Sequence, residues 1–232
     1  LRIIFCGGLL TISFLPYAQN KWDSLIYLLV EEPPSSELYG ELLVEIAWQI
    51  SELDPDTANY YTSLAMDYAQ KKGDDSILCR ALIAQSAVHS YKGKHAESIE
   101  LSYKAIRLAE ELRDSVSIMD ASNNIGIDLY YLEDYQGAIT YYQRLIEIAK
   151  LVNNQIQLGY GYNNIALIKG ELGQVEEEIE FYNLALEAFN KINDAYGLAN
   201  TQVNLGTAYN KVGKSTQAIE NLKNGYEVFQ SM

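Results

Sequence analysis

Three asparagines recur at intervals of 40 residues, and their side chains can form two kinds of hydrogen bond. They are Asn124, Asn164 and Asn204, each followed by Ile or Leu and then by Gly or Ala. A carboxamide both donates and accepts hydrogen bonds. A row of such groups can pair with the N–H and C=O groups of an extended peptide. The spacing therefore predicts a surface that binds peptide backbone without reading side chains.

Four further residues are expected on or beside the same surface, and the first three of them would tune its specificity. Asp120, Tyr160 and Asn200 each precede one of the asparagines by four residues, and Tyr131 follows the first of them by about two helical turns. The preceding unit has Ala84 at the asparagine position. The predicted row is therefore confined to three successive units.

The alternative is that these amides cap nearby backbone groups or bridge neighbouring units. The two interpretations differ in the effect of replacing Asn124 and Asn164 by alanine. A ligand-binding row predicts weaker binding with nearly unchanged stability. A structural role predicts a loss of stability.

Catalytic and metal-binding patterns are missing from the sequence. The two histidines, His89 and His95, lie six residues apart, which does not match an i, i+4 metal-binding pair. The acidic residues 176–178 fall at the predicted start of a helix, where carboxylates complement the helix dipole. Of the two cysteines, Cys6 lies in an apolar leader, which leaves Cys79 alone. We therefore expect no enzyme activity, no metal, no cofactor and no disulfide framework.

The charge of the chain makes nucleic acid an improbable partner. The formal net charge is −14, with 31 acidic and 17 basic residues, and the basic residues form no cluster. Phosphate-binding surfaces require clustered Lys and Arg. A solvated acidic surface explains this composition, and a basic partner is the functional alternative.

The asparagines belong to a longer repeat that positions them. A second row of positions has the same 40-residue spacing and holds Ala65, Ala105, Leu145, Ala185 and Gly225. Five units of this length cover residues 38–230. Self-similarity at such a period is typical of solenoid proteins.

Each unit is expected to form two amphipathic helices joined by a tight corner. In the third unit, apolar residues recur at spacings of three and four over residues 115–131 and again over 135–152. Corners contain Gly93, Gly173 or Gly213, where glycine favours the left-handed cap conformation. The first corner instead has Asp54 and Pro55, which suit an N-cap and a first helical turn.

Small residues recur where the two helices of a unit should cross. On the first helix they are Gly126, Ala166 and Gly206, and the positions expected to face them hold Ala138, Glu178 and Ala218. A missing side chain permits close approach of two helices. Glu178 departs from this pattern and leaves the packing of the fourth unit open.

The motif Leu205-Gly206-x-x-Tyr209, with Ala218 downstream, resembles the tetratricopeptide repeat. The period is 40 residues rather than the usual figure of about 34. The resemblance implies an all-α fold, a right-handed α-solenoid of five helical hairpins whose first helices line a concave wall. It also implies non-catalytic binding of a protein or an extended peptide. In the O-linked N-acetylglucosamine transferase superhelix, which these units resemble, asparagines at the position of Asn204 hold peptide backbone.

Residues 1–18 have the pattern of an export signal. Arg2 precedes an apolar stretch from Ile3 to Leu15, and Ala18 offers a cleavage point. A membrane anchor, a buried helix and a lipoprotein site at Cys6 are the alternatives, although bulky Phe5 disfavours the last. Residues 19–37 then form a linker with a short helix over Trp22–Val30, which would cover the open end of the array.

The combined pattern resembles the exported N-terminal region of bacterial sensor and regulator proteins. That resemblance implies a periplasmic or membrane-tethered scaffold or sensor, with membrane association through a downstream span. Two alternatives remain open. One is a structural solenoid that self-associates through its ends into a homo-oligomer. The other is a cytoplasmic regulator with an uncleaved leader.

Overall fold

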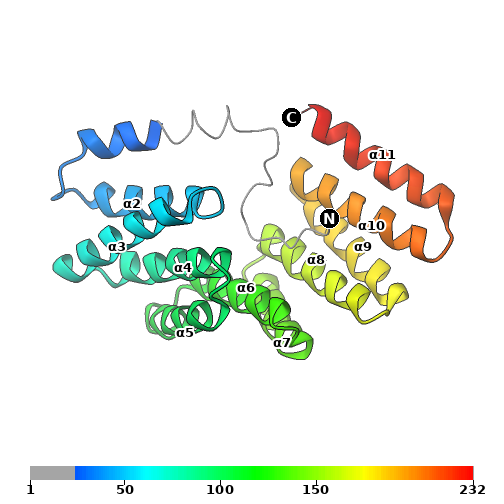
Figure 1. The fold of residues 1–232 in the computed structure, drawn as a ribbon, viewed down its shortest axis with the longest axis horizontal. Coiled ribbons are helices and arrows are strands. Elements are labelled where there is room, and N and C mark those ends of the chain that lie inside the picture. The colour runs from blue at the N-terminus through cyan, green and yellow to red at the C-terminus, as the bar shows by residue number, and fades with distance from the viewer. Residues whose placement is uncertain (1–23, 232) are drawn as a thin grey trace. The chain divides into compact units, whose positions relative to one another are not determined.

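The computed structural model describes residues 24–231, and no strand occurs among them. The helices fall into two compact units, which we call the N-terminal unit (to Leu132) and the C-terminal unit (from Glu133). Figure 1 shows the helices in chain order. The predicted signal segment, residues 1–18, lies outside the described residues. The predicted all-α fold class is confirmed.

The N-terminal unit begins with a helix over residues 24–31. It continues with α2 (Glu37–Ile50), α3 (Pro55–Lys72), α4 (Asp75–Tyr91), α5 (His95–Leu112) and α6 (Ser115–Tyr131). Sequential neighbours within the series α2 to α6 pack against each other, and α4 also contacts both α2 and α6. The first helices of successive hairpins, α2, α4 and α6, therefore lie side by side.

The C-terminal unit is likewise a series of helices that pack in chain order. It contains α7 (Tyr135–Leu151), α8 (Gln155–Glu171), α9 (Val175–Lys191), α10 (Ala195–Lys211) and α11 (Ser215–Ser231). Sequential neighbours from α7 to α11 are in contact, and α8 also contacts α10. None of the helices in residues 24–231 has the length and apolar character needed to cross a membrane.

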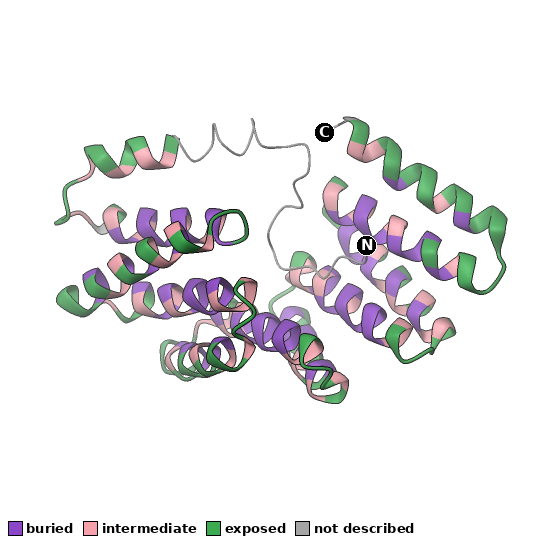
Figure 2. Cartoon of the chain, viewed as in Figure 1, coloured by how far each residue is buried: buried purple, intermediate pink, exposed green. Residues whose placement is uncertain are grey.

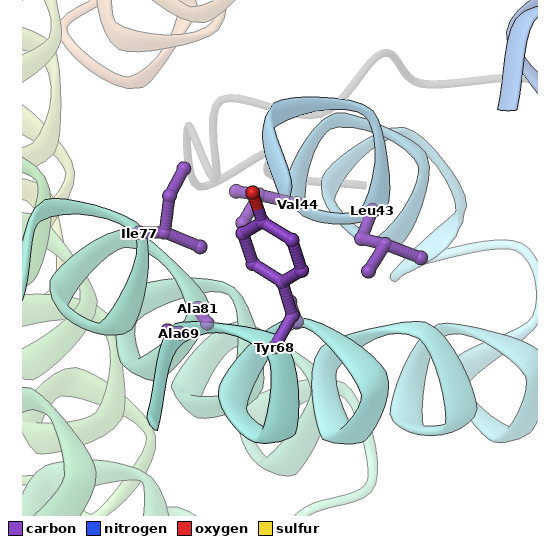
Figure 3. Packing of buried hydrophobic residues seen from close by; sticks show 7 residues of the cluster. Leu43, Val44, Tyr68, Ala69, Ile77 and Ala81 are labelled. Atoms are coloured by element: carbon purple, nitrogen blue, oxygen red, sulfur yellow. The ribbon is translucent and has the colours of Figure 1, made fainter. Parts of the chain in front are cut away.

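Apolar residues from three helices form the core at the start of the N-terminal unit. Leu43 and Val44 of α2 pack against Tyr68 of α3 and Ile77 of α4 (Figure 3). The hydroxyl of Tyr68 donates a 2.8 Å hydrogen bond to the carbonyl of Ser36, the N-cap residue of α2. This bond satisfies the one polar group that the Tyr68 side chain carries into the core.

The helix over residues 24–31 covers one end of this unit. Its Leu25, Ile26 and Leu29 pack against Ile46 and Ile50 of α2. Trp22, where the sequence placed the start of a leading helix, lies outside the described residues.

A left-handed residue ends each helix from α3 to α10, at intervals of 20 residues along the chain. Four of the eight positions are glycines: Gly73, Gly93, Gly173 and Gly213. The other four are Arg113, Glu133, Asn153 and Asn193, with φ between 53° and 61°. Glycine corners were expected from the sequence. Asp54 also caps α3 as expected, since its side chain accepts a 3.0 Å hydrogen bond from Thr57 N–H.

Glu178 is accommodated by a glycine that the repeat pattern does not contain. A Cβ at Gly170 would lie 2.5 Å from the Glu178 carboxyl group, so glycine leaves room for the carboxylate in its present position. The carboxylate then reaches Lys211 at the end of α10, with Nζ–O distances of 2.6 and 2.8 Å. This ion pair joins the fourth hairpin (α8 and α9) to the fifth (α10 and α11).

Candidate functional site

The predicted peptide-binding residues lie on first helices, but in two separate units. Asn124, Asp120 and Tyr131 belong to α6 of the N-terminal unit. Asn164 and Tyr160 belong to α8, and Asn200 and Asn204 to α10, of the C-terminal unit. The following paragraphs describe the two groups separately.

Asn124 bridges two first helices. Its side chain is 5% exposed, and Nδ2 donates hydrogen bonds to the Ile83 carbonyl (3.2 Å) and to Ser86 Oγ (2.7 Å) on α4. Both donor hydrogens of the amide are therefore used between neighbouring hairpins. For Asn124 this geometry favours the bridging interpretation over peptide binding.

Tyr131 lies at the end of α6 beside an acid–base pair. It is 54% exposed, and its ring stacks on His95 at a centroid distance of 5.1 Å and an interplanar angle of 15°. His95 Nδ1 lies 2.8 Å from Oδ1 of Asp128, which is fully buried. Burial raises the pKa of the Asp128 carboxyl group, and hydrogen bonds from Ser90, Ser98 and His95 oppose that rise. No local sequence pattern indicates this pair, because its residues are 33 positions apart.

Asp120 lies nearer the start of α6 and is partly buried. The neighbouring first helices carry an ion pair between Arg80 of α4 and Glu41 of α2. Each of these three residues is 39 or 40 positions from the next, so one row of first-helix positions in this unit is charged.

In the C-terminal unit, Asn200 and Asn204 have unused hydrogen-bonding capacity. Asn200 is 1% exposed, and neither its Oδ1 nor its Nδ2 has a hydrogen-bond partner. Asn204 is 5% exposed, and its Nδ2 also has none. The two residues are four positions apart on α10, so their side chains lie on one face of the helix.

One of the two hydrogen-bond partners that Asn124 has is missing around Asn204. Asn124 bonds the hydroxyl of Ser86, 38 positions earlier. The residue 38 positions before Asn204 is Ala166, which has no hydroxyl. Asn204 therefore occupies the same position in its repeat but lacks the hydroxyl partner that Asn124 has.

A short polar seam continues between α8 and α10. Thr201 Oγ1 donates a 3.3 Å hydrogen bond to Oδ1 of Asn163, whose own Nδ2 has no partner. Asn164 is buried at 2% exposure, and Tyr160 packs edge-on against Phe189 with ring centroids 5.6 Å apart. Sequence reasoning missed Asn163 and Thr201, although the Asn163–Asn164 pair matches Asn123–Asn124 one unit earlier.

The described residues offer no alternative metal centre. Residues 24–231 contain no group of three or more His, Cys, Asp or Glu side chains that could hold a metal ion. Cys79 is buried, burial raises the pKa of its thiol, and its Sγ donates to the Ala105 carbonyl at 3.4 Å.

Comparison with known proteins agrees with the repeat pattern. A family model described as tetratricopeptide repeat matches residues 77–150 and 158–231. A search of curated protein sequences found no match.

Several solved structures have the same fold. BtubC from P. vanneervenii is 18% identical with a TM-score of 0.71, and the alignment covers 94% of this chain and 90% of that one. A Rap protein complexed with competence and sporulation factor is 15% identical with a TM-score of 0.71, covering 94% and 73%. A signal transduction ATPase with a tetratricopeptide repeat sensor, from Pyrococcus horikoshii, is 18% identical with a TM-score of 0.72, covering 95% and 35%. At these identities the likeness concerns the fold alone.

The family model covers more than half of the chain, and its two matches run through the hairpins that carry the asparagines. Tetratricopeptide repeats generally form protein-interaction scaffolds without catalytic activity. The resemblance drawn from the sequence is confirmed: this chain belongs to the tetratricopeptide repeat family.

Proposed function

We propose that the chain binds an extended segment of another protein through buried amides on the first helices of its C-terminal unit. The observation that carries this proposal is Asn200, a buried amide with no partner for either polar atom. An unsatisfied buried polar group costs about 1–3 kcal/mol. A ligand that supplies one donor and one acceptor removes this cost.

Extended peptide backbone has the required chemistry. It presents N–H and C=O groups at regular intervals, and an asparagine can pair with both. Asn204, one helical turn from Asn200, adds a second donor. Because both side chains are at most 5% exposed, neighbouring side chains must move when the ligand enters.

The solved relatives support a role in recognition. One was solved in a complex with competence and sporulation factor, and another is described as carrying a tetratricopeptide repeat sensor. By analogy, we propose that this chain is a scaffold or sensor module whose partner is a peptide or a protein segment.

Binding can be tested without knowing the natural ligand. A phage-displayed library of random peptides is selected on the full chain, and a recovered peptide is titrated by fluorescence anisotropy. Asn200→Ala combined with Asn204→Ala should weaken binding about tenfold or more, as expected for two lost hydrogen bonds. The exposed Asn190→Ala is the matched control. Equal affinity of both variants would exclude the α10 amides as the site.

A second variant tests the same site by giving Asn204 the hydrogen-bond partner that it lacks. Ala166→Ser places a hydroxyl where Asn124 finds that of Ser86, so it should pair with Asn204. We expect peptide affinity to fall while stability is kept or increased. Unchanged affinity, in a variant whose stability has risen, would show that Asn204 does not contact the ligand.

We also propose that the chain acts outside the cytoplasm, as part of a sensor or regulator. The apolar leader over residues 1–18 and its resemblance to exported sensor regions support this location. N-terminal sequencing of the protein from its native host should find a start near Gln19. A start at Leu1 or upstream of it contradicts cleavage of an export signal.

A further inference from the structure

The buried amides between α8 and α10 have more unused donors than unused acceptors. No hydrogen bond is made by Nδ2 of Asn163, Asn200 or Asn204, whereas Asn200 Oδ1 is the only buried acceptor of these three side chains that lacks a partner. Each of the three residues is at most 5% exposed, and Figure 2 shows buried residues along both helices. The helices of the C-terminal unit therefore enclose these groups themselves. A ligand that satisfies them must supply more acceptors than donors.

The lysines of these helices are already used, so an anion is not that ligand. Helices α8, α9 and α10 contain one basic residue each, and every one of these lysines is paired with a glutamate: Lys169 with Glu177, Lys191 with Glu187 and Lys211 with Glu178. The whole chain has a formal net charge of −14, which repels anions. The acceptors must therefore come from neutral groups such as carbonyls.

A proline-rich peptide has this excess of neutral acceptors over donors. An ordinary residue presents one N–H and one C=O, whereas proline has no N–H and presents the carbonyl alone. Runs of proline form the polyproline II helix, which has no internal hydrogen bonds and leaves its carbonyls open to a partner. A single non-proline residue in such a run supplies one N–H, which is what Asn200 Oδ1 requires.

Two tyrosines flank these amides on the first helices. Tyr196 lies one turn before Asn200 on α10, and Tyr160 holds the position of Asn200 one repeat earlier on α8. Both tyrosines are partly buried and pack against the cluster that contains Phe189 of α9. Aromatic side chains line the grooves in which proline-rich segments dock. The surroundings of Asn200 therefore combine amide donors with aromatic rings.

We propose that the segment bound at the α10 amides is rich in proline and binds as a polyproline II helix. This ligand class rests on the proposed function, peptide binding by Asn200 and Asn204, and makes it more specific. Prolyl carbonyls accept hydrogen bonds from the unused Nδ2 groups, and proline rings pack on Tyr160 and Tyr196. Asn200 and Asn204 are separated by about 6 Å along the helix axis, which is about the rise of two polyproline II residues. Alternate carbonyls of one segment therefore match both amides.

The probe is a fluorescein-labelled peptide with one alanine between two runs of four prolines, titrated onto the full chain by fluorescence anisotropy. Its comparison peptide has the same length and alternates glycine and serine, so that every residue carries an N–H. We expect the proline peptide to bind at least about tenfold more tightly. The comparison peptide buries N–H groups for which the site has no acceptor, and it loses more conformational freedom on binding.

Substitution of the tyrosines tests where the proline rings lie. Tyr160→Leu and Tyr196→Leu should each weaken binding of the proline peptide about threefold or more, as expected for the loss of one aromatic contact. Tyr160→Phe keeps the ring and should bind like the unaltered chain. Tyr162→Leu is the matched control, because Tyr162 packs in the same cluster but lies about 200° around α8 from Tyr160 and contacts Phe181. Affinities are compared among variants that circular dichroism shows to be folded.

The amides must also contribute to binding of the proline peptide. Asn200→Ala combined with Asn204→Ala should weaken it about tenfold or more, whereas Asn190→Ala, at an exposed position, should not. If neither the designed peptides nor any library peptide loses affinity in that double variant, the proposed function fails, and the proline-rich ligand fails with it.

Three other results would overturn the proline-rich ligand alone. One is that the proline peptide does not bind at about 1 mM, the weakest affinity that would count as binding, while a library peptide binds and depends on Asn200 and Asn204. Another is that the glycine–serine peptide binds as tightly as the proline peptide. The third is that Tyr160→Leu and Tyr196→Leu, both folded, bind the proline peptide as well as Tyr162→Leu does.

Discussion

At the scale of single residues, asparagines at different positions of the first helices have different surroundings. Asn124 uses its amide hydrogens on α4, whereas Asn200 uses none of its polar atoms. Asn124→Ala should therefore lower the free energy of unfolding by about 1–3 kcal/mol, since it leaves the Ile83 carbonyl and Ser86 hydroxyl without that donor. Asn200→Ala should cost at least about 1 kcal/mol less, because no hydrogen bond is lost. Urea unfolding followed by circular dichroism measures both, and equal losses would contradict the contrast.

Asp128 predicts a pH dependence of stability. Its pKa is raised above the ordinary 3.8 by burial, so the folded chain holds the proton more tightly than the unfolded chain. Its contribution to stability is therefore complete below 3.8 and is lost as the pH rises through the raised pKa. Asp128→Asn should remove this part of the slope. Unfolding free energies of both proteins are compared at intervals between about pH 3 and 7, and parallel curves would show that Asp128 does not titrate in this way.

At the scale of elements, four helix ends force a non-glycine residue into the left-handed region. Glu133 and Arg113 have φ of 61° and 56° where other corners have glycine. The left-handed conformation costs about 1–2 kcal/mol for such residues, so Glu133→Gly and Arg113→Gly should each raise stability by about 1 kcal/mol. Gly173→Ala is the reciprocal control, because a Cβ there meets nothing within 4 Å and adds only backbone strain. It should lower the melting temperature where the other two raise it.

Helix boundaries were predictable because their signals are local. The Asp54 cap, the Pro55 start and the glycine corners each depend on a few adjacent residues. The left-handed conformation of Glu133 was not predicted, because glutamate itself disfavours that conformation. Only its position 40 residues after Gly93 indicates it. The sequence also did not show which asparagines lack a hydrogen-bond partner. The Ser86 hydroxyl that accepts from Asn124 lies 38 positions away, and an equivalent hydroxyl is present in one repeat but not in another.

At the scale of the whole molecule, stability is expected to be the sum of what each hairpin contributes and what it gains from its neighbours. The repeat pattern predicted that hairpins stack, because one hairpin cannot bury its outer face alone. It did not predict how the fourth hairpin tolerates Glu178, because that answer involves Gly170 in the same hairpin and Lys211 in the next.

The pair of Glu178 and Lys211 should couple the last two hairpins. The Glu178 side chain is 2% exposed and its Lys211 partner 27%, so Lys211→Met leaves a buried carboxylate without its cation. Breaking such a pair costs about 3 kcal/mol. Adding Glu178→Ala should restore most of the stability, since it returns the small residue that Ala138 and Ala218 provide in the adjacent units. Hydrogen exchange should show that α10 and α11 lose protection in the single variant and regain it in the double variant. If the single variant keeps wild-type protection in both helices, the two hairpins are held together by apolar packing alone.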